Sequence, residues 1–207
     1  LLHQQMDLMR ESELEAARIR HDVRHHTLLI EEYVRKGEYE ELLSYLAQYG
    51  EDIEKALMAG LLHDCAKCLP GDTKIKLCKK YHLSVSEIER SNPSLLHAKL
   101  GAFLAAKKYH IKDKEIMNAI ASHTTGCPHM SLLNKIIYIA DYMEPGRKEL
   151  PNMAEVRKLA FTDIDACLYR ILEDSLEYLN GKNVPVDPMT EKTYLYYKSK
   201  RDAGEEV

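Results

Sequence analysis

A histidine and an aspartate stand side by side as His63-Asp64, directly after a run of apolar residues with helical spacing. We expect one helix over residues 53–68, so that the pair presents an imidazole and a carboxylate from one rigid element. Both groups bind divalent metal ions. A histidine bonded to a neighbouring aspartate is also a common structural arrangement, so the residues downstream decide what the pair means.

Three further metal-binding side chains lie at or near the ends of later helical segments, namely His97, His123 and Asp141. Together with His63 and Asp64 they offer nitrogen and oxygen ligands from several elements. Such a ligand set suits borderline-hard divalent metals such as Fe, Mn, Ni or Zn. The sequence therefore predicts a metal centre.

The composition argues against several kinds of partner. The chain has 207 residues, with 29 Lys and Arg against 33 Asp and Glu, a formal net charge of -4 and a pI near 6.2. One main domain is expected from this length, and no basic surface for nucleic acid or for an anionic membrane is indicated. The five scattered cysteines follow no secretory signal or long apolar span, which predicts reduced thiols and a cytoplasmic protein.

Helical periodicity runs through nearly the whole chain, and no alternating run indicates a strand, so we expect an all-α fold. An N-terminal helical hairpin is predicted over residues 6–36 and 39–48, ending at glycines. Later helices are predicted over residues 73–81, 86–90, 95–109, 114–122, 131–142, 153–161, 163–180 and 189–199. Irregular loops at residues 126–128 and 144–147 flank the candidate ligands, where functional groups are often held.

Four phrases in this order carry a family resemblance: Gly60-Leu61-Leu62-His63-Asp64-Cys65-Ala66-Lys67, Leu96-His97-Ala98-Lys99-Leu100-Gly101-Ala102, His123-Thr124-Thr125-Gly126, and Met130 through Arg147. Over about residues 51–200 the chain resembles the HD-domain phosphohydrolases of the YqeK-like group, the symmetrical bis(5'-nucleosyl)-tetraphosphatases of bacteria. The resemblance implies an HD-domain helical bundle with two divalent metal ions. It implies that these ions are iron, with Mn, Ni or Zn as alternatives. It also implies that the enzyme cleaves diadenosine tetraphosphate into two ADP.

Hydrolysis of a phosphoanhydride requires neutralisation of its negative charge and a nucleophile available near neutral pH, and two metal ions supply both. In that scheme Asp64 and Asp141 are the carboxylates best suited to bind or bridge metal, while the three histidines supply neutral imidazoles. Asp64 and Lys67 are the expected catalytic residues, with Lys67 one helical turn beyond His63 and facing the same site. Ordinary surface solvation is the alternative for Lys67.

Substrate contacts are expected from Lys67, from the loop residue Arg147 and from Thr124, Thr125 and Gly126. The arginine side chain can bind a phosphate group through two parallel hydrogen bonds. The two threonines and the glycine offer hydroxyl and backbone donors to phosphate, although a helix C-cap followed by a turn explains them nearly as well.

The N-terminal segment departs from the family pattern, which has one more metal-binding histidine where Val34 or a close neighbour stands here. Residues 12–48 instead resemble the phosphoacceptor hairpin of sensor histidine kinases, but no ATP-binding boxes follow. We therefore expect a hairpin over residues 1–50, atypical for the family, before an HD-type domain over 51–207. In the alternative, the hairpin is a divergent first part of the HD domain and His26 replaces the missing ligand.

Three functions remain open on the sequence alone. The first is metal-dependent hydrolysis of dinucleoside polyphosphates by a cytoplasmic enzyme whose partner is a small nucleotide. The second keeps the metal site and changes the substrate to a nucleotide monophosphate or a guanosine alarmone. The third is a non-catalytic helical signalling module that forms a homodimer through its N-terminal hairpin. Metal analysis separates the enzymes from the module, because only the enzymes need tightly held metal.

Overall fold

The structure is a computed structural model that describes residues 49–143, 150, 152–182 and 184–204. These residues belong to the unit that runs from Tyr45 to Val207. Every regular element in the described ranges is helical, which confirms the all-α fold class. The hairpin predicted over residues 6–48 lies outside the described residues. None of the described helices combines the length and the apolar character needed to cross a membrane.

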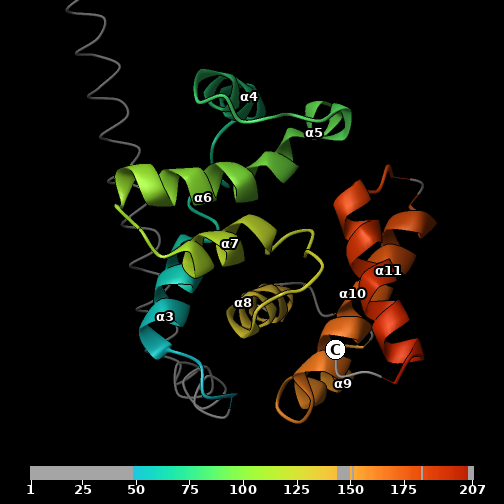
Figure 1. Cartoon of the computed structure of the whole chain (residues 1–207). Coiled ribbons are helices and arrows are strands. Elements are labelled where there is room, and N and C mark those ends of the chain that lie inside the picture. Colours follow the sequence, from blue (N-terminus) through green and yellow to red (C-terminus); the bar gives the residue numbers. More distant parts are fainter. Residues whose placement is uncertain (1–48, 144–149, 151, 183, 205–207) are drawn as a thin grey trace, which may run out of the picture. The chain divides into compact units, whose positions relative to one another are not determined.

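The described helices follow one another in the order shown in Figure 1: α3 (Ile53–Leu62), α4 (Gly71–Lys80), α5 (Glu87–Ser91), the 3₁₀ helix η1 (Pro93–Leu95), α6 (Leu96–Lys108), α7 (Lys114–Ser122), α8 (Leu132–Tyr142), α9 (Met153–Ala160), α10 (Ile164–Gly181) and α11 (Pro188–Asp202). From α4 onward the predicted boundaries differ from the observed ones by at most three residues.

Polar residues at the helix starts explain why these boundaries are predictable. An aspartate or serine side chain accepts hydrogen bonds from the first-turn N–H groups of most of the helices, at Asp52, Ser86, Asp113, Ser131, Asp163 and Asp187. Each such cap stabilises a helix by about 1 kcal/mol and depends only on local sequence. Helix α6 has no side-chain cap and follows η1 directly.

The helix predicted over residues 53–68 is wrong in its last third, because α3 ends at Leu62 and His63 is its C-cap. Residues 63–68 form turns, in which the Cys65 N–H donates to Leu62 and the Lys67 N–H to Asp64, at 3.1 and 2.8 Å. Adjacent residues on an α-helix point about 100° apart and cannot face one point. The turns let His63 and Asp64 face the same site.

Two apolar clusters hold this turn segment from both sides. The larger cluster is formed mainly by α3, α7, α8 and α10 and includes Leu62, while the smaller joins α4 to α6 and includes Ala66. Cys65 packs against both clusters. Because the residues before and after Asp64 are buried in different clusters, the backbone of the turn has little freedom to move.

Helix α11 fixes the loop between α7 and α8. The buried Tyr197 accepts a hydrogen bond from the Met130 N–H at 2.8 Å. Gly126 has φ +66°, and a Cβ there would lie 2.8 Å from Thr193 Cγ2 and still closer to Met130. Only glycine fits that backbone position without displacing α11.

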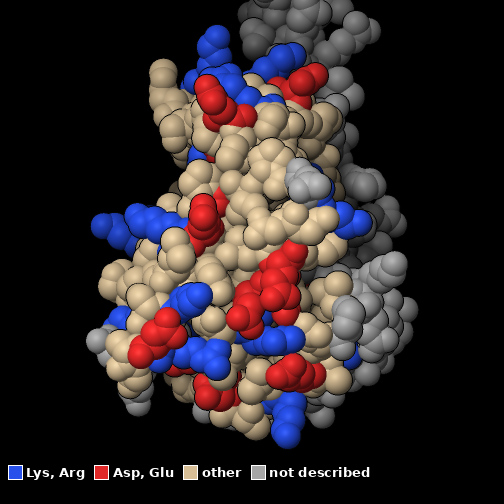
Figure 2. Space-filling view, turned by 90° about the vertical axis from the view of Figure 1, so that its right-hand side faces the viewer, with Lys and Arg blue, Asp and Glu red and all other residues tan. Residues whose placement is uncertain are grey.

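Acidic and basic side chains are interspersed on the face presented in Figure 2. Among the described residues on that face, neither the acidic nor the basic side chains form a large continuous patch.

Candidate metal centre

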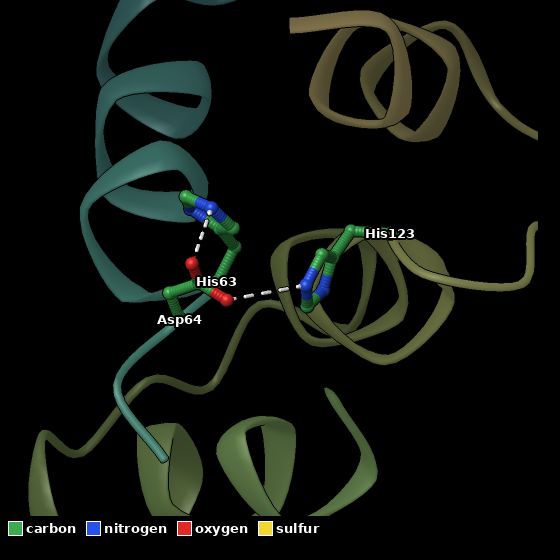
Figure 3. Close-up of side chains that lie close together, drawn as sticks. All are labelled: His63, Asp64 and His123. Carbon is green, nitrogen blue, oxygen red and sulfur yellow. Dashed lines mark ion pairs between the residues drawn. The ribbon is translucent and has the colours of Figure 1, made fainter. Parts of the chain in front are cut away.

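The structure brings all five predicted ligands together, from the turn after α3, the start of α6, the C-cap of α7 and the last turn of α8. Asp64 Oδ1 lies 3.3 Å from His97 Nε2 and 3.5 Å from His123 Nε2. Asp64 Oδ2 lies 3.5 Å from His63 Nε2, which is also 3.6 Å from Asp141 Oδ1. Figure 3 shows His63 and Asp64, from the segment that follows α3, lying opposite His123 at the end of α7.

The same backbone contact orients each imidazole of the cluster. The Nδ1 atoms hydrogen-bond to the carbonyl oxygen three residues earlier, at 2.6 Å for His63 to Gly60, 2.6 Å for His97 to Ser94 and 2.7 Å for His123 to Ile120. A carbonyl oxygen only accepts, so each Nδ1 carries the proton. Each ring, in its neutral form, turns an Nε2 lone pair toward the centre of the cluster, as a metal ligand requires.

Several atoms of the cluster lack the partners that a metal ion would provide. Asp64 Oδ1 is buried and has no hydrogen-bond partner in the described structure, and an unsatisfied buried oxygen is costly. His97 Nε2 and His123 Nε2 are 3.0 Å apart, so two lone pairs face each other when both rings are neutral. Two ligand atoms each about 2.1 Å from a metal ion, at a right angle, are themselves about 3 Å apart.

A divalent cation therefore fits this donor set. Ligand atoms of His63, Asp64 and His123 all lie within 4.8 Å of one another. Asp64 and Asp141 are only 17% and 16% exposed at their side chains, whereas His123 is 1% exposed. The cluster is thus deepest at His123 and reaches solvent at the two carboxylates and at His63, whose side chain is 24% exposed.

Without a cation, protons take the place of positive charge in the cluster. Burial opposes a charged His63, but its bonds to Asp141 and Asp64 outweigh burial and raise its pKa to about 10. Burial likewise opposes a charged Asp64, yet its contacts with His123, His63 and His97 lower its pKa far below the usual range. The carboxylate stays anionic and attracts cations, so protons and metal ions compete for the histidines.

Two predicted substrate-binding side chains contact the cluster directly. Lys67 is half-exposed, and its Nζ donates to Asp64 Oδ2 at 2.5 Å. The Thr124 hydroxyl lies 3.3 Å from His97 Nε2 and 3.2 Å from His123 Nε2. Lys67 reaches the site from the turn segment rather than from a helix face, which corrects the predicted geometry.

The remaining predicted residues are placed differently. The Thr125 hydroxyl donates to the Gly126 carbonyl at 3.0 Å, and the Gly126 N–H donates to the Ser122 carbonyl at 2.7 Å. These donors are therefore engaged within the loop. Arg147 lies outside the described residues, as does His26.

The structure also reveals a residue that the sequence did not single out. Lys74 of α4 is only 4% exposed, and its Nζ donates to the Lys67 carbonyl at 3.0 Å. Burial lowers the pKa of its ammonium group. In the sequence Lys74 is one of several lysines in a charged helix, so no local signal distinguishes it from its solvated neighbours.

Comparison with known proteins places the chain in a family. Residues 37–146 match the HD domain family. The chain is 39% identical over 152 residues to the symmetrical bis(5'-nucleosyl)-tetraphosphatase of Bacillus subtilis (strain 168), covering 73% of this chain and 81% of the relative. It is 37% identical over 158 residues to the protein of the same name from Halalkalibacterium halodurans, covering 76% and 83%.

A solved structure shows the same arrangement of helices. A crystal structure described as a predicted HD superfamily hydrolase involved in NAD metabolism, from Clostridium acetobutylicum, matches with a TM-score of 0.73 and 40% identity. The match covers 77% of this chain and 84% of the other. The matched HD region contains all five cluster residues. The chain belongs to the HD-domain phosphohydrolases of the symmetrical bis(5'-nucleosyl)-tetraphosphatase family.

Proposed function

We propose that this chain hydrolyses dinucleoside polyphosphates and cuts diadenosine tetraphosphate symmetrically into two ADP. The observation that carries the proposal is the cluster of three Nε2 lone pairs and two carboxylates, in a chain whose relatives are named as symmetrical tetraphosphatases. A phosphoanhydride needs charge neutralisation at its centre, and this donor set is suited to hold the cations that provide it.

We propose that the site binds two divalent metal ions. Iron is the metal that we expect, and Mn, Ni and Zn are the alternatives. The orientation of Asp64 supports two positions. Its Oδ1 faces His97 and His123, whereas its Oδ2 faces His63, which in turn meets Asp141. His97, His123 and Asp64 would hold one ion, and His63, Asp141 and Asp64 would hold the other.

When bound, such ions supply positive charge to phosphoryl oxygens and lower the pKa of a water molecule. The residues of the chain position the reactants. The anionic Asp64 holds Lys67 beside the cluster, where the ammonium group can meet the negative phosphate chain or the departing ADP. The Thr124 hydroxyl stands at the other edge of the cluster, next to two imidazoles, and can donate to a phosphoryl oxygen.

Product analysis tests the reaction. Metal-loaded protein is incubated with diadenosine tetraphosphate and the nucleotides are separated by chromatography, with chelator-treated protein as the control. We expect ADP as the sole nucleotide product and little turnover in the control. Release of AMP together with ATP would contradict a symmetrical cut.

The same assay separates the alternative substrates. Turnover of a nucleotide monophosphate or of a guanosine alarmone in preference to diadenosine tetraphosphate would keep the metal chemistry and change the substrate. Cytoplasmic location and the lack of a nucleic-acid or membrane partner stay predictions from composition. A homodimer formed through the N-terminal hairpin stays a prediction for residues outside the described ranges.

A further inference from the structure

His123 and Thr124 stand where a helix ends, and a helix end needs additional contacts to stay fixed. His123 is the C-cap of α7, and the loop that follows it runs to Ser131 at the start of α8. The last turn of a helix has carbonyl groups without intrahelical partners, and it frays unless other groups hold it. A functional side chain has to be held to within about 0.5 Å. The position of the His123 imidazole therefore depends on the contacts that hold the end of α7.

Asn134, in the first turn of α8, makes such contacts from a buried position, since only 4% of the residue is exposed. Its amide Nδ2 donates to the Ser122 hydroxyl at 3.0 Å and to Cys127 Sγ at 3.8 Å. Its amide Oδ1 accepts from the Ser131 hydroxyl at 2.8 Å. One side chain thus joins the residue before His123, the middle of the loop and the start of α8.

The Ser122 hydroxyl connects this amide to the body of α7. Its oxygen accepts from Asn134, while its own hydrogen donates to the Asn118 carbonyl at 2.8 Å, one turn earlier in the helix. Ser122 is buried as well. Because Ser122 and His123 are joined by one peptide bond, a displacement of Ser122 moves the backbone of His123 and with it the Nε2 atom that faces the cluster.

Capping of α8 accounts for only part of this network. Ser131 is the N-cap of α8, and its hydroxyl accepts from the Asn134 N–H at 3.3 Å, a backbone contact that does not need the Asn134 side chain. The N–H donors of the amide instead cross to the end of α7 and to the loop. A buried amide costs free energy unless it is hydrogen-bonded, whereas a fully satisfied buried network fixes one arrangement of the elements that it joins. The Asn134 amide therefore serves the end of α7 more than its own helix.

We propose that Asn134 is a positioning residue of the metal centre, which acts through Ser122 to fix His123 and the ion position that includes it. The inference rests on the two-ion centre of the proposed function. The other proposed ion position, with His63 and Asp141, has no ligand from α7. Helix α8, which carries Asp141, is held independently by its apolar residues in the larger cluster. Loss of the Asn134 amide should therefore weaken one ion position and spare the other.

Metal titration of two variants tests the proposal. Asn134→Leu replaces the amide by an apolar side chain of similar size, and Ser122→Ala removes only the hydroxyl that accepts the hydrogen bond. Asn152→Leu is the matched control, because it removes an amide that donates to Asp174 at 2.7 Å, between the start of α9 and α10, in a contact that includes no cluster residue. Binding of Mn²⁺ to each metal-free protein is measured by calorimetry, together with the urea midpoint of unfolding.

We expect Asn134→Leu and Ser122→Ala each to raise the dissociation constant of one Mn²⁺ ion by about tenfold or more, and that of the other by less than about twofold. Combining them should add little, because both break the same hydrogen bond. The control should change neither constant, whatever its effect on the urea midpoint. Unchanged Mn²⁺ binding would overturn the proposal, as would equal weakening of both ions or a loss confined to Asn134→Leu. If Asn134→Leu does not fold, Ser122→Ala decides by the same criteria.

A second background identifies the affected position. In His97→Ala, in which that position is already empty, Asn134→Leu should not weaken the remaining ion further. A further loss there would contradict the assignment, because Asn134 would then also support the other position. Failure of this inference is distinguishable from failure of the proposed centre. If the wild-type protein binds fewer than two Mn²⁺ ions, the proposed metal complement fails. If it binds two and the variants bind both normally, only the role of Asn134 fails.

Discussion

At the scale of single residues, the site depends on which nitrogen each histidine turns toward Asp64. The three Nδ1 atoms are bound to backbone carbonyls, so the three Nε2 atoms face the cluster and are the atoms that can bind a metal ion. The contacts that orient the rings are main-chain contacts, which survive substitution of the neighbouring ligands. Loss of one ligand should therefore empty a metal position without disturbing the other rings.

We predict that His63→Ala, Asp64→Ala and Asp141→Ala each remove bound metal and activity while the helical circular dichroism is largely retained. His97→Ala and His123→Ala should leave a half-loaded protein, because the carboxylate oxygen near both residues is Asp64 Oδ1, whereas Asp64 Oδ2 is near His63. Elemental analysis of purified protein measures the metal. His82→Asn is a suitable control, since His82 is exposed with φ 56°, a conformation that asparagine tolerates. Full metal content in the first three variants would refute the assignment.

A second prediction at this scale concerns Lys67. Lys67→Ala should lower kcat by about 10²-fold, as expected for the loss of one charged donor to a transition state, and should leave metal content nearly unchanged. Lys67→Arg should recover part of the rate, because it keeps the positive charge. Steady-state kinetics and elemental analysis check both. If Lys67→Ala instead loses its metal, the side chain supports the cluster and does not act on substrate.

At the scale of elements, the turn segment over residues 63–68 is held between two apolar clusters and by Lys74 of α4. The buried ammonium group fixes the Lys67 carbonyl and hence the backbone from which the Lys67 side chain extends. Lys74→Met removes this hydrogen bond and also a buried charge, two effects that offset each other in stability.

We therefore predict that Lys74→Met lowers kcat by about threefold to tenfold while the urea midpoint of unfolding changes little. Lys76→Met, at an exposed position of the same helix, is the control and should alter neither value. Equal kinetics in the two variants would show that Lys74 does not position the turn.

Helix α5 is tied to α6 by the pair of Glu89 and Lys99. Burial opposes a charged Glu89, but hydrogen bonds from Lys99 and Ser86 outweigh it and lower the pKa of the carboxyl group. A carboxyl whose pKa is lower in the folded state stabilises the fold above its unfolded value of about 4.3, and this stabilisation is lost as the pH falls toward the folded pKa.

The matching prediction is that Glu89→Gln lowers the free energy of unfolding at neutral pH by about 1–3 kcal/mol and flattens its decline below about pH 4.5. Urea unfolding at a series of pH values measures both effects. Glu87→Gln, at an exposed position of the same helix, should retain the wild-type profile. A profile for Glu89→Gln that parallels the wild type would exclude this pair as a source of the pH dependence.

At the scale of the whole molecule, the open question is how the first fifty residues relate to the metal centre. The HD match begins at residue 37, within the predicted hairpin. The match includes the end of the predicted hairpin but not His26, so the role of His26 as a replacement ligand stays a prediction.

We predict that His26→Ala lowers both metal content and activity, because a dinuclear site short of one protein ligand holds its metal less tightly. His25→Ala is the neighbouring control. Elemental analysis and turnover of diadenosine tetraphosphate provide the measurements. If His26→Ala changes neither, the hairpin is an appendage and the cluster works without it.

The sequence by itself determined the helical class, the helix boundaries from α4 onward and the five side chains of the cluster. These depend on local signals: apolar spacing, aspartate and serine caps, and the types of residue that bind metal. Such signals depend on residues that are close together in the sequence, so they can be recognised without a structure.

The tertiary structure alone decided the end of α3, the role of Gly126, the buried Lys74 and the hydrogen bond from Asn134 to Ser122. Helix α3 stops at Leu62 because the turn after it is packed between two clusters built from distant helices. Gly126 is required because Thr193, far along the chain on α11, lies against it. Each of these features is set by contacts between residues remote in sequence, and periodicity and caps carry no information about such contacts.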